Sequence, residues 1–155
     1  MSDLTYIRHN NRWIYLAVVL DLYSRKVIGW AMGKKKNVAL TSRALLSAIK
    51  RRNPKPGLIF HTDRGSEYRS REFQKVNNRY GIIPSMNRAG KCTDNAEMES
   101  FFHTLKGDLI KDSVFKTGKE LRNSIAGYIQ YFYNKSRLHF SLNYMSPVEY
   151  GAVVV

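Results

Sequence analysis

Hydrophobic positions in the first third of the chain follow the spacing of β-strands. Short runs at 4–7, 13–20 and 26–32 are rich in apolar, aromatic and β-branched residues, and polar turn segments at 9–11 and 21–25 separate them. The pattern predicts three strands joined by short turns. Such strands form an antiparallel meander.

Beyond these strands the pattern alternates between helices and strands. A helix is predicted up to residue 52, with Asn37 as its cap, because apolar residues recur at helical spacing until the Pro-rich segment 53–57. The other predicted elements are a strand at 58–61, a helix at 70–80, a strand at 82–86, helices at 95–110 and 118–134, and an irregular tail.

The order of the elements predicts the fold class. Strand–helix–strand units favour parallel pairing, which adds parallel strands to the antiparallel meander. We therefore expect an α/β protein with one five-stranded mixed sheet flanked by helices. The sequence shows no internal repeat or interdomain linker, so residues 1–155 are expected to form a single domain with a C-terminal helix and tail at about 118–155.

Composition excludes several classes of protein. The 155 residues are about one domain's length, and 43% of them are hydrophobic, which is enough for a packed core. The longest apolar run, 14–20, is too short to cross a membrane, and the first residues lack a secretory signal. The single cysteine cannot form an internal disulfide. These features predict a cytoplasmic protein.

The net charge of +14 indicates a polyanionic partner, most often a nucleic acid, with a generic basic surface as the alternative. Residues 1–52 carry 11 basic and 2 acidic side chains, whereas residues 53–112 carry 10 basic and 8 acidic ones. The acidic groups are thus concentrated in the middle of a cationic chain. A metal site that faces a phosphate backbone would have this distribution.

Asp63 is the first candidate for an acidic site. It closely follows the predicted strand 58–61, and α/β sheets place their sites at the carboxyl ends of parallel strands. Its alternative role is to open the turn before Gly65.

Glu99 is the second candidate. It shares one polar face of the predicted helix 95–110 with His103 and Lys106. The alternative is an ordinary solvated helix face. Two phenylalanines that anchor this helix against the sheet favour the functional interpretation.

Asp3 and Asp21 compete for the third position. In the predicted first hairpin Asp3 lies opposite residue 17 or 18, which places Asp21 roughly 10–13 Å farther along. Only one of them can share a metal with Asp63. Because the first strand can lie beside the strand that ends at Asp63, the sequence favours Asp3, and Asp21 is expected to cap the turn before Ser24.

Three converging carboxylates suit phosphodiester chemistry. Cleavage needs an activated oxygen nucleophile and a stabilised 3′ leaving oxygen, and two Mg²⁺ ions about 3.5–4 Å apart can supply both when oxygen ligands hold them. Without metal, clustered carboxylates repel one another, which raises their pKa values.

Motifs along nearly the whole chain resemble those of a known family. They lie at 3–7, 15–21, 24–25, 29–30, 61–68, 81–86 and 94–102 and, in the tail, at Tyr133, Asn134, Arg137, His139, 141–142 and 146–147. In these motifs the chain resembles the catalytic core of bacterial insertion-sequence transposases whose protein is made by fusing two reading frames. That group belongs to the retroviral-integrase (DDE) superfamily of ribonuclease H-like enzymes, so the resemblance implies a ribonuclease H-like fold.

The resemblance implies an acidic triad of Asp3, Asp63 and Glu99, with 35 residues between the last two. These residues would be catalytic and would bind two Mg²⁺ ions, with Mn²⁺ as a possible substitute. The implied reaction is cleavage at transposon 3′ ends followed by attack of the freed 3′-OH on another phosphodiester. The triad agrees with the choice of Asp3 over Asp21.

The resemblance also implies DNA contacts and partners. Lys106 stands where such enzymes place a DNA-contacting lysine, with His103 one turn away, and the basic residues Arg64, Arg88 and Lys91 near the triad segments could hold phosphates. Their alternative is an ordinary basic surface. The implied partners are transposon-end and target DNA and further copies of the chain, assembled on DNA in the nucleoid of a bacterial cytoplasm.

One feature departs from the family pattern. Family members usually carry a DNA-binding helix-turn-helix region ahead of the first acid, which here is residue 3. We therefore expect an excised core or a truncated gene. Two alternatives to a transposase core remain: a purely hydrolytic nuclease of the same fold, and a catalytically inactive DNA-binding or oligomerising remnant.

Overall fold

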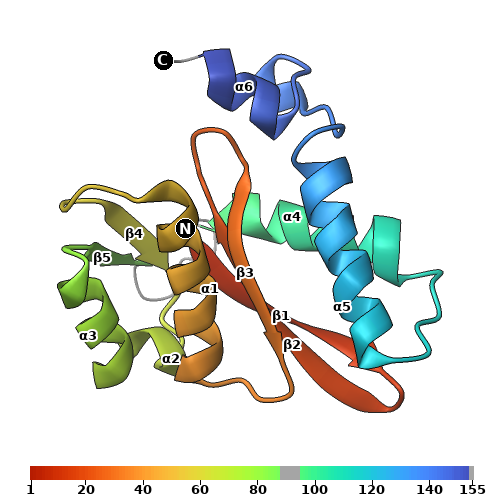
Figure 1. The fold of residues 1–155 in the computed structure, drawn as a ribbon, viewed down its shortest axis with the longest axis horizontal. Helices are drawn as coiled ribbons and strands as arrows, with labels where there is room; N and C mark the ends of the chain where they lie inside the picture. Colours follow the sequence, from red (N-terminus) through yellow and green to blue (C-terminus); the bar gives the residue numbers. More distant parts are fainter. Residues whose placement is uncertain (88–94, 154–155) are drawn as a thin grey trace.

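The computed structural model describes residues 1–87 and 95–153. Five strands form one sheet in the order β3-β2-β1-β4-β5 (Figure 1). The strands are β1 (Ser2–His9), β2 (Arg12–Leu20), β3 (Val27–Gly33), β4 (Ile59–Thr62) and β5 (Ile83–Met86). The first three are antiparallel to one another, while β4 is parallel to both β1 and β5. The prediction of a mixed five-stranded sheet is confirmed.

A tight turn fixes the register of the first hairpin. Asn10 and Asn11 both adopt positive φ angles, of 47° and 58°, which asparagine tolerates better than most residues. With this turn Asp3 pairs with Val18, one of its two expected partners.

The joint between β1 and β4 is short. These two parallel strands share one register pair, Ser2 with Thr62, whereas β1 and β2 pair along their whole length. Asp3 and Asp63 directly follow the two residues of this pair. The antiparallel and parallel halves of the sheet therefore meet where the two predicted acids stand.

Three of the described helices begin at side-chain caps that the sequence supplies. The described helical segments are α1 (Val38–Arg52), α2 (Ser66–Arg69), α3 (Arg71–Arg79), α4 (Ala96–Leu105), α5 (Gly118–Gly127) and α6 (Pro147–Val153), with π-helical η2 (Lys106–Ile110) and η3 (Tyr128–Tyr133) and the 3₁₀ turn η4 (Phe140–Leu142). The side chains of Asn37, Ser70 and Thr117 accept hydrogen bonds from backbone N–H groups in the first turns of α1, α3 and α5.

Helices cover both faces of the sheet (Figure 1). Alternation along β2 sends Leu16 and Val18 into a core with α4 and α5, and Ala17 and Val19 into a second core with α1 and α3. Phe101 of α4 belongs to the first core and is 1% exposed. Because α4 shares this core with Ile7 of β1, the helix is held against the strand that carries Asp3.

The tail is not irregular as predicted. Ser146 and Glu149 form a reciprocal cap at the start of α6: the Ser146 hydroxyl accepts from the Glu149 N–H, and the Glu149 carboxylate accepts from the Ser146 N–H. Pro147 occupies the first helical position, which needs no N–H donor. The buried Asn134 side chain bonds both the N–H and the C=O of Val27, which ties the tail to β3.

In the described part of the chain, we find no helix with the length and apolar character needed to cross a membrane.

Candidate active site

The structure brings Asp3 and Asp63 to the same end of the sheet. Asp3 Oδ1 accepts a hydrogen bond from the Leu4 N–H at 2.7 Å, and Asp63 Oδ1 accepts one from the Gly65 N–H at 2.8 Å. Asp63 therefore also opens the turn before Gly65, so the two alternatives for this residue are compatible. Backbone bonds hold both carboxylates in place on the ends of β1 and β4.

Glu99 approaches this end of the sheet from α4. Its side chain is exposed, while Met98 and Phe102 on either side are buried in the core. Asn95, which is 6% exposed, lies just before the helix and donates from Nδ2 to Asp3 Oδ2 at 3.4 Å. This hydrogen bond connects the start of the Glu99 helix to the first acid.

Electrostatics link the three acids. The pKa of Asp3 is raised to about 6, first by burial and then by the Asp63 and Glu99 carboxylates, against the lowering effects of the Leu4 N–H and of Lys36. A like-charge effect from both partners means that each lies within electrostatic range of Asp3. A cation bound among them would relieve this repulsion.

The donor set suits a hard divalent cation, although the acids do not close around a single point. Among residues 1–87 and 95–153, no three His, Cys, Asp or Glu side chains lie close enough together to hold one ion. Mg²⁺ commonly uses only one or two carboxylates and completes its shell with water and substrate phosphate. Asp3 could form such a pair with Asp63 or with Glu99, since both act on its pKa. The chemistry of the residues therefore fits the cation, and the shared site stays a prediction.

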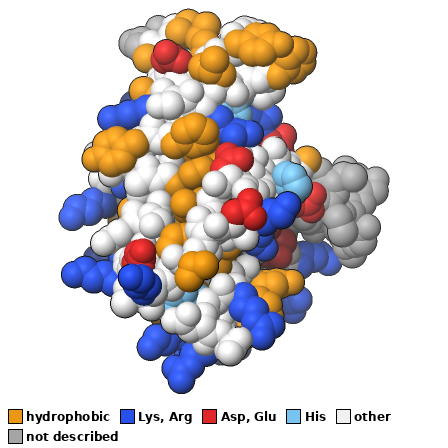
Figure 2. Space-filling model, turned by 90° about the vertical axis from the view of Figure 1, so that its right-hand side faces the viewer, with side chains coloured by type: hydrophobic (Ala, Val, Ile, Leu, Met, Phe, Trp, Pro, Cys, Tyr) orange, Lys and Arg blue, Asp and Glu red, His pale blue; other side chains and the backbone are white. Residues whose placement is uncertain are grey.

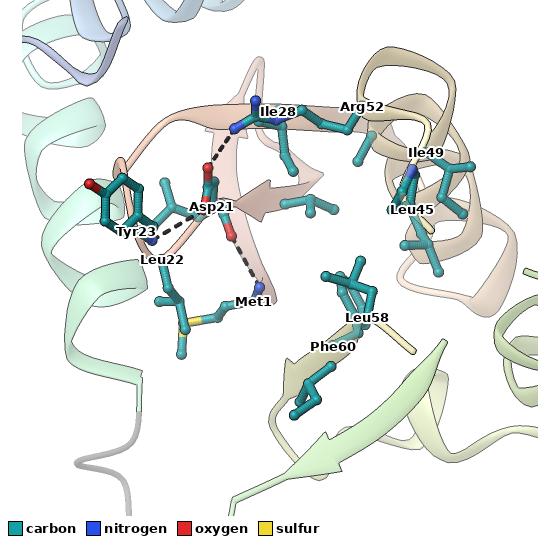
Figure 3. Close-up of a pocket in the computed structure, with 15 residues that line it drawn as sticks. Met1, Asp21, Leu22, Tyr23, Ile28, Leu45, Ile49, Arg52, Leu58 and Phe60 are labelled. Atoms are coloured by element: carbon teal, nitrogen blue, oxygen red, sulfur yellow. Dashed lines mark hydrogen bonds and ion pairs between the residues drawn. The ribbon is translucent and has the colours of Figure 1, made fainter. Parts of the chain in front are cut away.

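Asp21, the alternative to Asp3 for the third acid, stabilises the turn between β2 and β3 (Figure 3). Its carboxylate accepts from the Tyr23 N–H at 3.1 Å and from the Ser24 hydroxyl at 2.8 Å, and it pairs with Arg52. It stands beside a largely apolar cavity of about 460 Å³ that Met1 also lines. The expected turn-capping role of Asp21 agrees with these contacts.

The predicted DNA-binding residues fall into three groups. Lys106 and His103 line a shallow hollow, in which the Lys106 ammonium lies 5.0 Å from the centre of the exposed Tyr6 ring. Arg64 is exposed in the turn after Asp63. Arg88 and Lys91 lie outside the described residues. Figure 2 shows Lys and Arg side chains distributed over the face of the molecule that carries α4 and α5.

Sequence reasoning missed Glu67 and Lys36. Glu67 is 7% exposed; its Oε1 lies 3.8 Å from the Lys36 ammonium, and its buried Oε2 has no hydrogen-bond partner within the described chain. A Cβ at Gly65 would lie 2.9 Å from both Asp63 Oδ1 and Glu67 Oε2, so glycine lets the two carboxylates approach each other. The signal was present in the 61–68 motif, where an acid follows the glycine by two residues.

Tyr68 lies within electrostatic range of Glu67, Asp3 and Asp63. Its hydroxyl lies 3.0 Å from the Ser2 hydroxyl, and burial raises its pKa, with Asp3, Asp63 and Glu67 adding to the effect. The Tyr68 ring itself belongs to the second core, with α1 and α3.

Comparison with known proteins identifies the family. Residues 1–92 match the family profile described as integrase core domain, and residues 99–153 match a second profile of the same description. The chain belongs to the integrase core domain family.

Curated relatives of this integrase core are transposases. The chain is 42% identical over 150 residues to the transposase for insertion sequence element IS904 of Lactococcus lactis, a match that covers 97% of this chain and 59% of the relative. It is 40% identical over 149 residues to the transposase InsF for insertion sequence IS3A of Escherichia coli, covering 96% of this chain and 52% of the relative. The resemblance to insertion-sequence transposases is confirmed, and the chain spans somewhat more than half the length of these relatives.

Solved structures share the fold of this integrase core. The catalytic core domain of HTLV-2 integrase, in a complex with magnesium, superposes with a TM-score of 0.74 at 21% identity, over 96% of this chain and 91% of that one. A chain of the simian T-cell lymphotropic virus intasome gives a TM-score of 0.77 at 18% identity, over 96% of this chain and 51% of that one. The predicted ribonuclease H-like fold class is confirmed.

Proposed function

We propose that this integrase core is the catalytic part of a DNA transposase. It would cleave DNA at transposon 3′ ends and then join the freed 3′-OH to a second phosphodiester. One observation carries the proposal: in the integrase core fold, Asp3 of β1 lies within electrostatic range of both Asp63, which follows β4, and Glu99 of α4. The transposase names of its relatives support the same reaction.

Asp3, Asp63 and Glu99 are proposed as both catalytic residues and metal ligands. They would hold two Mg²⁺ ions, or Mn²⁺ in their place, as the magnesium complex of the HTLV-2 core suggests for a protein of this fold. Bound divalent ions would supply an activated oxygen nucleophile and stabilise the leaving 3′ oxygen. The strand ends and the buried face of α4 would keep the three carboxylates in position.

Basic side chains around the acids would hold the DNA. We assign this role to Lys106, His103 and Arg64, and also to Arg88 and Lys91 on the strength of the sequence alone. Phosphate contacts of this kind fix the register of the duplex without reading its sequence.

The proposed partners are transposon-end and target DNA, together with further copies of the chain assembled on that DNA. The integrase cores of the same fold have been solved in dimeric and trimeric forms, which supports assembly. We further propose that residues 1–155 act as one domain in the bacterial cytoplasm, in association with the nucleoid.

A branched DNA that mimics the strand-transfer product tests the proposal. With Mg²⁺ or Mn²⁺ we expect both cut and joined products, and Glu99→Gln should abolish both. Glu72→Gln, which removes an exposed acid from α3, is the matched control and should react like the unaltered chain.

The products separate the alternatives. Cutting without any joined product would indicate a hydrolytic nuclease. DNA binding without any metal-dependent product would indicate an inactive remnant, and either result would overturn the proposal.

A further inference from the structure

A polar pocket of about 240 Å³ lies on another side of α4 from Glu99. Three distant parts of the chain form it: Arg25 from the β2–β3 turn, one face of α4, and the tail. The tail contributes Tyr133, Arg137 and His139, which belong to the motif that has no part in the proposed active site. The lining also contains the hydroxyl groups of Ser100, Thr104 and Ser141.

Two arginines of this pocket are held in place by carboxylates. Arg25 Nη1 lies 2.9 Å from Glu97 Oε1, and Arg137 Nη1 lies 2.9 Å from Asp108 Oδ2. Each pair engages one nitrogen of a guanidinium group that carries five N–H donors. The pairs therefore orient both groups and leave donors for a ligand.

A buried polar atom of the pocket also lacks a partner. His139 Nε2 has no hydrogen-bond partner among the residues described. Buried polar groups in native proteins nearly always have one. Such an atom in the lining indicates a site that a polar ligand completes.

The positive charges of the two arginines determine which kind of ligand the pocket favours. The pKa of His139 is lowered by burial and, in addition, by Arg137 and Arg25, so that a neutral imidazole faces two fixed cations. Burial raises the pKa of the Tyr133 hydroxyl, and the positive charges of the same two arginines oppose this rise. Glu97, the acid in the lining, is paired with Arg25, so the remaining donors favour an anion.

We propose that this pocket, which we call the arginine pocket, binds a backbone phosphate of DNA. Arginine donors match the oxygens of a phosphate, and hydroxyl groups on two sides can complete its shell. This inference rests on the proposed function, because the proposed function is the reason to take DNA as the source of the phosphate.

The arginine pocket and the acids engage different phosphates. Glu97 and Ser100 face the pocket, whereas Glu99 lies on a separate face of α4. The phosphate in the arginine pocket is therefore not the one that reacts. DNA would contact α4 on two of its faces.

Ser141→Glu tests the pocket with little disturbance of the fold. Ser141 is an exposed member of the lining, so a glutamate there would repel phosphate and leave both arginine–carboxylate pairs in place. Ser113→Glu is the matched control, because it makes the same charge change at an exposed position outside the pocket.

Affinity for a short duplex, measured by fluorescence anisotropy without metal over a range of salt concentrations, is the first readout. For Ser141→Glu we expect an affinity about tenfold lower and a slope of log affinity against log salt reduced by about 0.9, the loss of one phosphate contact. Ser113→Glu should change the affinity less than about twofold. Equal affinities and slopes for the two variants would overturn the proposal.

Inorganic phosphate is the second probe. At constant ionic strength it should raise the melting temperature of the unaltered chain and of Ser113→Glu, but not of Ser141→Glu. A lost response to phosphate with an unchanged DNA affinity would assign the pocket to a free anion and overturn the DNA contact. Neither measurement needs catalysis, so a chain that fails to cut or join DNA would refute the proposed function and leave this test intact.

Discussion

At the scale of single residues, Asp3 is held in a position that disfavours its charge. Its pKa of about 6 lies above the ordinary value of 3.8, so the folded state binds the proton more tightly than the unfolded state does. Protonation therefore stabilises the fold, and that stabilisation is complete below about pH 4 and is lost as the pH rises through 6. Ionisation costs the folded chain up to about 3 kcal/mol above this range.

Asp3→Asn is expected to raise the melting temperature in a chelating buffer at pH 7.5, because it removes a charge that the fold disfavours. The gain should vanish as the pH falls toward 4. Thermal unfolding at a series of pH values measures it. Asp21→Asn replaces a carboxylate that forms an ion pair with Arg52, so it should lower the melting temperature instead. A gain for Asp3→Asn that persists at pH 4 would contradict the electrostatic explanation.

Glu67 depends on Lys36 as its counter-ion. Lys36→Gln should lower the free energy of unfolding by about 1 kcal/mol, since it leaves a buried carboxylate without its cation, while the partly exposed lysine keeps the effect small. Lys35→Gln, the same change at an exposed neighbour, is the control. In a Glu67→Gln background the Lys36 effect should become smaller and leave only the part that Lys36 exerts on Asp3, as denaturant unfolding of the four chains would show.

The roles of single residues could be predicted where they depend on neighbours that are close in the sequence or paired in a hairpin. The choice of Asp3 over Asp21 needed only a hairpin register and strand adjacency, and the structure gives Asp21 the turn contacts expected of it. Glu67 was not predictable in the same way. Its burial and its contact with Lys36 depend on how α2 packs against a loop 31 residues earlier, which no local pattern encodes.

At the scale of elements, β3 and α1 pack unusually closely. A Cβ at Gly29 of β3 would lie 2.4 Å from the Ala44 carbonyl oxygen of α1 and 2.7 Å from the Ala48 Cβ. Both of those neighbours are fixed parts of the helix, so they cannot turn aside. The absence of a side chain at Gly29 sets the distance between the helix and the sheet.

Gly29→Ala is therefore expected to lower the free energy of unfolding by about 2 kcal/mol or more. Gly127→Ala is the matched control, because a Cβ there meets nothing within 4 Å and alanine favours the helix α5. It should raise stability by about 0.5–1 kcal/mol. Urea unfolding of both variants measures the difference, and equal effects would show that the close approach is unimportant.

Elements were predictable where periodicity or a cap marks them. Asn37 and the apolar spacing behind it identified α1, and the turn at 9–11 identified the first hairpin. The short helices α2 and α6 lacked periodicity. In α6 the cap formed by Ser146 and Glu149 was the available signal, and tertiary contacts through Asn134 complete it.

At the scale of the whole molecule, the net positive charge is expected to dominate the affinity for DNA. With a net charge of +14, DNA binding should release many counterions. If the chain covers six or more phosphates, its affinity for DNA should fall about a thousandfold between 50 and 200 mM salt. Anisotropy titrations measure this dependence, and a nearly flat response would exclude a surface that follows the phosphate backbone.

The mixed topology was predictable at this scale because strand order follows from connection rules, whereas the spacing of the acids was not. The positions of Asp3, Asp63 and Glu99 relative to one another depend on how the helices pack against the sheet. No pattern in the sequence states how far apart their oxygens stand.

The single register pair between β1 and β4 has a mechanical consequence. Few backbone hydrogen bonds cross this seam, so the meander and the parallel half can separate locally at a lower free energy than global unfolding requires. Amide protons beside Ser2 and Thr62 should accordingly exchange faster than those in the middle of β2. A ligand that bridges Asp3 and Asp63 would join the two halves of the sheet across this seam and slow the exchange of those amide protons.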